Sequence, residues 1–276
     1  MNLNSYMPVK LITGAGCVRS SGKELAKLGK KCLIVTGRSS AKACGALTDV
    51  TETLDANGQT WLVFDRIGPN PKLTDCMAAA DKAIAADVDF ILGIGGGSPL
   101  DAAKCIAVLA ANPGMTQEQL YVFDWANAPL KIAAVGTTAG TGSEVTQVSV
   151  MNCGEEKMTI NNPVFMPTAA VIDPELMLTV PPRVTMVTGL DALSHALEGY
   201  WSVNHQPLTD LYAIEAVRFV LNNLEKAFLD GSDKEARCNM AYAALLAGLA
   251  FGQPKTAGSH ACSYPLSMDY HLPLRE

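Results

Sequence analysis

Short apolar runs alternate with amphipathic stretches along the first two-thirds of the chain. Each run is brief and is closed by Gly, Asp or Thr, which is typical of buried strands. The stretches between them place apolar residues three and four positions apart, the spacing of one helix face. The pattern predicts strands at Cys32–Thr36, Trp61–Phe64, Phe90–Ile94, Ile132–Val135 and Ala169–Ile172, and helices at Ala41–Ala56, Leu73–Ala86 and Pro99–Ala111.

This alternation predicts an α/β fold with a mainly parallel sheet covered by helices on both faces. Pro8–Thr13 is expected to add an edge strand or a hairpin arm. After Pro181-Pro182 the pattern predicts helices alone, at Val184–Tyr200, Leu208–Leu229 and Glu235–Gly252. Because a double proline stiffens the chain and starts a helix well, we expect an α/β domain over residues 1–180 and a helical domain over residues 181–276. The chain ends at Arg275-Glu276 without a concluding helix, so we expect the helical domain to be truncated.

The composition indicates a folded protein, with 49% hydrophobic and 17% charged residues. A formal net charge of −6 argues against a nucleic-acid partner or an anionic membrane surface. No apolar run approaches the length of a bilayer span, and the N-terminus lacks the features of a signal peptide. The eight cysteines are scattered without a C-x-x-C pair, which favours buried thiols in a reducing compartment. We therefore expect a cytoplasmic enzyme.

A glycine-rich turn follows the predicted strand at Phe90–Ile94 and opens the next predicted helix. Gly95, Gly96 and Gly97 allow a ligand to approach the backbone closely, and Ser98 is expected to cap the helix, with Pro99 in its first turn. Free N–H groups at such a helix start favour a bound phosphate. The turn is neither a G-x-G-x-x-G fingerprint nor a P-loop. A tight turn that binds nothing is the alternative.

A second candidate segment, Thr137–Thr146, also follows a predicted strand. It combines glycines with hydroxyl side chains suited to hydrogen bonding with a sugar or phosphate. The hydroxyl-bearing candidates are Thr137, Thr138, Thr141 and Ser143. Taken alone, the segment is equally typical of a solvated loop.

Asp191 and His195 lie four residues apart in a helical pattern, so both side chains emerge on one helix face. A carboxylate oxygen and an imidazole nitrogen on one face make half a site for Fe²⁺ or Zn²⁺. The alternative is an ordinary surface Asp–His pair. His260 and His271 are candidates for the other half, from a later helix and the turn that follows it.

At these residues the sequence resembles the iron-dependent (group III) alcohol dehydrogenases. The resemblance runs from about residue 8 to the last residue. It implies a nicotinamide-binding domain, a helical second domain, a divalent metal and the reversible oxidation of a small-molecule alcohol to an aldehyde or ketone; we expect a homodimer. The segments that carry the resemblance are Gly95–Ser98 with Asp101 and Ala103-Lys104, Thr137–Glu144, Gly189–Glu198, Asn70-Pro71 and Ile172-Asp173-Pro174.

By this resemblance Asp191, His195 and His260 fall on three of the family's four metal-ligand positions, and they are the expected catalytic residues, with Fe²⁺ or Zn²⁺ as the metal. Leu274 stands where the family has its fourth ligand, a histidine. His271 lies three residues earlier and reaches the ion only if the turn is rearranged. We therefore expect a weakened, exchangeable metal site.

The expected cofactor is NADP or NAD. NAD-preferring relatives carry an aspartate after the first strand of this domain, whereas this chain has Gly37 followed by Arg38. Loss of the carboxylate removes repulsion of a 2′-phosphate, which favours NADP. Lys157 matches a lysine that approaches the cofactor in relatives, although a surface lysine is an equal alternative.

Two other interpretations stay open at this stage. The first is another enzyme of the same fold, such as a polyol dehydrogenase or a dehydroquinate-synthase-like lyase; the Thr137–Glu144 string favours an alcohol dehydrogenase instead. The second is a catalytically impaired fragment that binds a nucleotide, which Leu274 and the unfinished helical domain favour.

Overall fold

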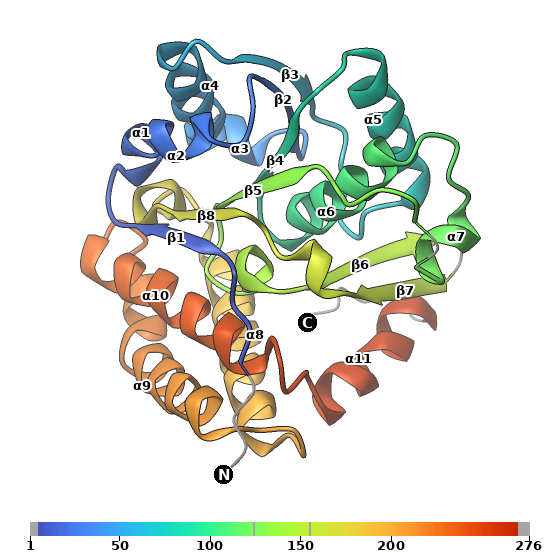
Figure 1. Ribbon diagram of the computed structural model, residues 1–276. Helices are drawn as coiled ribbons and strands as arrows, with labels where there is room; N and C mark the ends of the chain where they lie inside the picture. Colours follow the sequence, from blue (N-terminus) through green and yellow to red (C-terminus); the bar gives the residue numbers. More distant parts are fainter. Residues whose placement is uncertain (1–4, 124, 155, 270–276) are drawn as a thin grey trace. The chain divides into compact units, whose positions relative to one another are not determined.

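The computed structural model describes residues 5–123, 125–154 and 156–269 (Figure 1). It divides into two compact units. The α/β unit comprises the described residues of Pro8–Thr137 and Gln147–Asp173, and the helical unit comprises those of Met1–Met7, Thr138–Thr146 and Pro174–Glu276. The domain limits expected from the sequence, 1–180 and 181–276, stay a prediction. They differ from the two units in assigning residues 1–7, 138–146 and 174–180 to the α/β domain.

A parallel sheet forms the centre of the α/β unit, as the sequence predicts. Its strands follow the order β1-β8-β5-β4-β2-β3, and every neighbouring pair is parallel. The expected extra strand is confirmed as an edge strand, because it pairs in parallel with β8. The strands are β1 (Lys10–Thr13), β2 (Lys31–Thr36), β3 (Thr60–Phe64), β4 (Phe90–Gly95), β5 (Lys131–Gly136) and β8 (Ala169–Ile172).

Helices connect these strands and cover the sheet on both faces. Right-handed crossovers put α5 and α6 on one face and α4 on the other. In agreement, α5 packs against α6, whereas α4 packs against α1 and α2. The single helix expected over Ala41–Ala56 is two helices, because Gly45 with φ 81° interrupts it. The helices are α1 (Cys17–Ser20), α2 (Gly22–Ala26), α3 (Ser40–Ala43), α4 (Ala46–Ala56), α5 (Leu73–Ala85), α6 (Gly97–Ala111) and α7 (Gln117–Tyr121).

An antiparallel pair of strands, β6 (Val148–Cys153) and β7 (Glu156–Asn161), was not predicted from the sequence. Helix α6 holds it through two charged side chains. Nζ of the fully buried Lys104 donates to the carbonyl of Val148 over 2.7 Å. Oδ2 of Asp101 accepts from the backbone N–H of Val150 over 3.1 Å. Both side chains therefore attach these strands to the helix that follows the glycine-rich turn.

The helical unit contains α8 (Pro182–Trp201), α9 (Pro207–Leu229), α10 (Lys234–Phe251) and α11 (Gly258–Asp269). The three long helices expected from the sequence are confirmed, and a proline opens both α8 and α9. Small residues let α8 approach its neighbours: a Cβ on Gly189 would lie 2.3 Å from Cδ1 of Leu224. Short 3-10 turns occur in both units: η1 (Ser143–Val145) and η3 (Pro174–Met177) in the helical unit, and η2 (Pro163–Phe165) in the α/β unit. Within the described ranges, no helix is long and apolar enough to cross a membrane.

Candidate metal centre and nucleotide site

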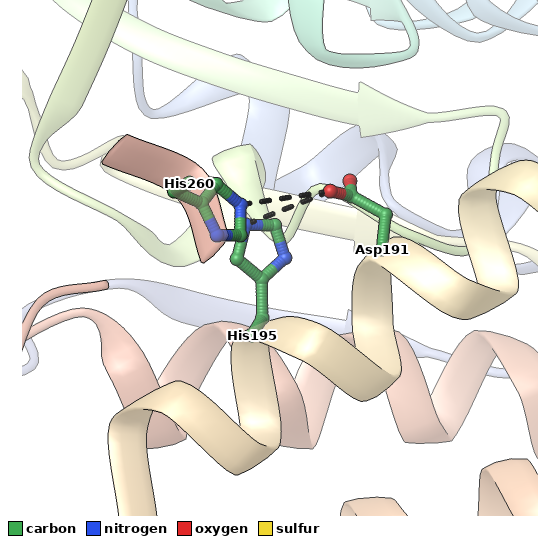
Figure 2. Close-up of side chains that lie close together, drawn as sticks. All are labelled: Asp191, His195 and His260. Carbon is green, nitrogen blue, oxygen red and sulfur yellow. Dashed lines mark ion pairs between the residues drawn. The ribbon is translucent and has the colours of Figure 1, made fainter. Parts of the chain in front are cut away.

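Three side chains from two helices of the helical unit converge on one point (Figure 2). Asp191 and His195 project from successive turns of α8, and His260 comes from α11. Nε2 of His195 lies 3.9 Å from Oδ1 of Asp191, and Nε2 of His260 lies 3.7 Å from the same oxygen. One donor atom from each of the three residues lies within 4.8 Å of those of the other two. The structure thus brings together the residues that the sequence singled out.

The second nitrogen of each imidazole ring is engaged by an acceptor. Nδ1 of His195 lies 3.3 Å from the backbone carbonyl of Gly140, and Nδ1 of His260 lies 2.7 Å from Oε1 of Glu198. An oxygen acceptor at Nδ1 favours the tautomer that carries its proton there. In neutral rings this leaves the Nε2 lone pairs directed toward Asp191, which is the arrangement that a metal-binding pair of histidines requires.

Glu198 is fully buried and has partners for both carboxylate oxygens. Oε1 accepts from the hydroxyl of Ser194 and lies beside the His260 ring, and Oε2 accepts from the backbone N–H of Ala257 over 2.5 Å. Burial raises the pKa of this carboxyl, but the hydrogen bonds from His260, Ser194 and Ala257 outweigh it and lower the pKa below its ordinary value. Glu198 is therefore an anion inside the helical unit.

The pKa of His260 is shifted upward, in the direction opposite to that of Glu198. Burial lowers the pKa of its ring, whereas the nearby carboxylates of Asp191 and Glu198 raise it, and the net pKa lies above the ordinary value. The ring also stacks on His195, which in turn stacks on Phe251 with ring centroids 4.1 Å apart. Charge and stacking together fix where the His260 ring lies.

A pocket of about 170 Å³ opens beside this cluster. Asp191 and His260 line it together with Ser194, Ser259 and Ser263, and with the apolar side chains of Val187 and Leu190. The side chains of Asp191 and His195 are 7% and 8% exposed, so the cluster is largely shielded but not sealed from this pocket.

The donor set fits a divalent transition metal. One carboxylate oxygen and two imidazole nitrogens are ligands that Fe²⁺ and Zn²⁺ both accept. Both rings are already held by Nδ1 partners, so little reorientation is needed. His271 and Leu274, on which the expectation of a weakened site depends, lie outside the described residues. The assignment of Asp191, His195 and His260 as metal ligands stays a prediction.

The glycine-rich turn lies at the point where the strand order reverses. From β2 the chain proceeds outward to β3, and then returns across the sheet to β4 on the other side of β2. In parallel sheets, ligands bind at the carboxyl ends of the strands at such a switch point. Gly37 follows β2, Gly95 ends β4, and Thr137 follows β5 and donates its N–H to the Gly95 carbonyl over 3.0 Å. Three expected cofactor residues therefore share this edge.

The backbone of the turn requires glycine at position 95. Its φ of 148° is one that other residues rarely adopt, and a Cβ there would lie 2.7 Å from Cγ of Pro99. Gly96, with φ −81°, is the N-cap of α6, and no side chain caps the helix. The expectation that Ser98 caps it is thus wrong, because the helix begins at Gly97, two residues before the expected start at Pro99. The first N–H groups of α6 have no acceptor within the helix, as an anion site needs.

The remaining expected cofactor residues are distributed differently. Asp101 attaches β6, and Nζ of Lys157 donates to Oδ1 of Asn70 over 3.2 Å. Thr138, Thr141 and Ser143 belong to the helical unit. There the Thr141 hydroxyl oxygen accepts from the Ser143 N–H over 3.2 Å. The cofactor assignments of all these residues stay predictions.

Sequence reasoning missed Glu198 and Gly140, which hold the two histidine rings. The signal for Glu198 was its position, since it follows His195 by three residues on the same helix face. The sequence gives no signal for Gly140, because this residue contacts His195 through its backbone carbonyl.

Comparison with known proteins identifies the family. The family model for iron-containing alcohol dehydrogenases matches residues 8–174, and the model for the C-terminal region of the Fe-containing alcohol dehydrogenase family matches residues 185–274. The chain belongs to the iron-containing alcohol dehydrogenase family. This confirms the resemblance inferred from the glycine-rich turn, the Thr137–Glu144 string and the α8 motif.

Relatives and solved structures agree with this membership. The chain is 38% identical to long-chain-alcohol dehydrogenase 1 of Geobacillus thermodenitrificans, over 94% of this chain and 66% of the relative. It is 35% identical to the NAD-dependent methanol dehydrogenase of Bacillus methanolicus, over 98% of this chain and 71% of the relative. The crystal structure of an iron-containing alcohol dehydrogenase from Thermotoga maritima matches with a TM-score of 0.94 and 36% identity, covering 99% of this chain and 75% of that one. The chain thus spans about two-thirds to three-quarters of these proteins.

Proposed function

We propose that this protein is a metal-dependent oxidoreductase that transfers hydride between a small-molecule alcohol and NAD(P). The observation that carries the proposal is the convergence of Asp191, His195 and His260, with both Nδ1 atoms engaged so that both Nε2 atoms face one carboxylate oxygen. Membership of the iron-containing alcohol dehydrogenase family supports iron as the metal.

Each group of residues has a distinct part in this chemistry. A divalent ion held by Asp191, His195 and His260 would supply Lewis-acid chemistry that lowers the pKa of an alcohol oxygen. Asp191 contributes one negative charge, and the two histidines contribute neutral nitrogens, so the ligand set leaves a divalent ion with net positive charge. His195 is held by the Gly140 carbonyl and by stacking on Phe251.

The α/β unit binds the nucleotide in this proposal. The first turn of α6 and the glycines before it receive the pyrophosphate, and Gly37 lies where the adenosine ribose of a dinucleotide is held at a switch point. A nicotinamide cofactor held there would supply the acceptor or donor of the hydride. A relative is named as NAD-dependent, which supports a nicotinamide cofactor. Gly37 and the exposed Arg38 make NADP the preferred form in our proposal.

The matching family supports an alcohol dehydrogenase over a lyase of similar fold. We extend the proposal to a cytoplasmic homodimer that acts on an alcohol or aldehyde.

The test is a metal titration alongside a nucleotide titration of the same protein. We expect one divalent ion and one NAD(P)H per chain. His195→Ala should lose the ion and keep the nucleotide, whereas Gly96→Val should lose the nucleotide and keep the ion. Metal-loaded protein should oxidise NAD(P)H in the presence of an aldehyde, and His195→Ala should not. A chain that binds nucleotide but no divalent ion would instead be a nucleotide-binding protein.

A further inference from the structure

We propose that Glu198 is a positioning residue that fixes the tautomer of His260 and holds this ring in the metal site. The inference rests on the metal centre proposed above and deepens it. It concerns a residue that touches neither the proposed ion nor a substrate, and that acts through its contact with His260.

One face of α8 carries two of the proposed metal ligands and also Glu198, which contacts the third. Asp191 and His195 occupy two turns, and Glu198 follows His195 by three residues. Glu198 reaches across to α11, where Oε1 lies 2.7 Å from Nδ1 of His260 and Oε2 accepts from the Ala257 N–H just before the helix begins. The helix that supplies two ligands thus also anchors the third.

The chemistry of an ionised carboxylate decides the orientation of the ring. Both oxygens of Glu198 accept hydrogen bonds, Oε1 from the Ser194 hydroxyl and Oε2 from the Ala257 N–H, so the carboxylate offers no proton to His260. Nδ1 of His260 must therefore carry a proton when it faces Glu198. The neutral ring then presents an unprotonated Nε2, 3.7 Å from Asp191. A carboxylate behind a ligating histidine also raises the basicity of the ring, which strengthens its bond to a metal.

The energetic cost of burying a carboxylate also supports a positioning role for Glu198. A carboxylate with no exposed surface is expensive unless every oxygen is satisfied. Glu198 meets that requirement with Ser194, Ala257 and His260. An amide at this position would keep an acceptor for His260, but its NH₂ would face the N–H of Ala257. A methyl group would leave Nδ1 without an acceptor.

The first measurement is the affinity of the 276-residue chain for Zn²⁺ and Co²⁺, by competition with a chromophoric chelator. Glu198→Ala should weaken binding by about 10- to 100-fold, the usual effect of removing such a partner. Glu198→Gln should retain part of the affinity, since it rescues the contact with His260 alone. Glu225→Ala removes an exposed glutamate of α9 and is the matched control, expected to leave affinity unchanged.

A double-mutant cycle separates positioning from general stability. In a His260→Ala background there is no ring to orient, so Glu198→Ala should then change metal affinity by no more than about twofold. A merely structural Glu198 would weaken the metal site by the same factor in both backgrounds. Circular dichroism and thermal melting establish that each variant is folded.

The second measurement needs no metal. Nitrogen-15 NMR of the metal-free protein, at a pH above the titration of His260, should show the proton of this ring on Nδ1. In Glu198→Ala the proton should move wholly or partly to Nε2, and Glu225→Ala should leave it on Nδ1. A His260 tautomer unaffected by Glu198→Ala, or equal metal affinity of the wild type and folded Glu198→Ala, would overturn the inference. Absence of metal binding in the wild type would count against the proposed function, and the tautomer would still test Glu198.

Discussion

The imidazole rings of His195 and His260 stack with their centroids 4.6 Å apart and their planes inclined by 23°. The stack continues through His195 to Phe251, so the His195 ring is held between a phenyl ring and its partner histidine. Because the Nε2 atoms of both histidines face Asp191, the stack and the two Nδ1 acceptors together set the direction of the proposed ligand atoms.

The first prediction concerns Phe251. Phe251→Ala removes a buried ring beside His195, so it should lower the free energy of unfolding by about 3 kcal/mol. It should also weaken metal binding, because His195 gains room to turn. Phe251→Leu refills most of the space, so it should lower the free energy of unfolding and the metal affinity by less. Urea unfolding and chelator competition measure the two effects. Metal affinity unchanged in a destabilised Phe251→Ala would show that stacking does not orient His195.

The second prediction concerns the glycine-rich turn. Gly96 has an extended backbone that valine also adopts, so Gly96→Val should fold normally. Its side chain would occupy the space next to the first N–H groups of α6, and binding of NAD(P)H should fall by at least about tenfold, the equivalent of 1.4 kcal/mol. Fluorescence titration with the reduced nucleotide measures this loss. Wild-type affinity in a folded Gly96→Val would mean that the phosphates bind elsewhere.

The third prediction concerns the coenzyme. A Cβ at Gly37 would lie 3.4 Å from the Ile67 carbonyl, so an aspartate fits there with little adjustment. We expect the wild type to bind NADP(H) at least as tightly as NAD(H). Gly37→Asp should reverse this preference by repelling the 2′-phosphate, and Gly37→Asn is the uncharged control. A clear preference of the wild type for NAD(H) would contradict the account.

The fourth prediction concerns alkaline pH. Burial, reinforced by the carboxylate of Asp173, raises the pKa of the Cys17 thiol from 9.0 to about 12. Because the folded-state pKa is the higher one, the stability that this thiol contributes is complete below pH 9.0 and is lost as pH rises toward 12. Urea unfolding at successive pH values should therefore show a smaller alkaline loss of stability in Cys17→Ala than in the wild type. Parallel pH profiles would contradict this.

The central parallel strands β2, β4, β5 and β8 could be predicted because they are buried on both faces and read as continuous apolar runs. The β6–β7 pair could not, since its residues are mixed in polarity and include Asn152, Lys157 and Asn161. Sequence reasoning also put the start of α6 too late, at Pro99 with Ser98 as its cap, whereas the helix starts at Gly97. Gly96 and Gly97 have no side chain to mark a helix start, and the boundary depends on backbone geometry.

The α8 half of the site could be predicted because Asp191 and His195 share the four-residue spacing of one helix face. The groups that hold the two histidine rings, Glu198 and the Gly140 carbonyl, could not be predicted. An acidic residue such as Glu198 usually faces solvent on a helix, and only the fold shows that it is buried against His260. The Gly140 carbonyl reaches His195 because the loop approaches α8 so closely that a Cβ on Gly140 would lie 2.7 Å from Thr188. Such a contact leaves no mark in side-chain spacing.

The most direct test of the central claim is a Co²⁺ titration of the metal-free protein, followed by visible absorption. Cobalt substitutes for iron or zinc and reports its ligands through its spectrum. The account predicts saturation at one ion per chain, with a spectrum that is lost in Asp191→Ala and in His195→Ala and that is altered, with weaker but measurable binding, in His260→Ala. A chelator should remove the ion readily. Saturable binding that survives all three substitutions, or no binding by the wild type, would contradict the metal site proposed for Asp191, His195 and His260.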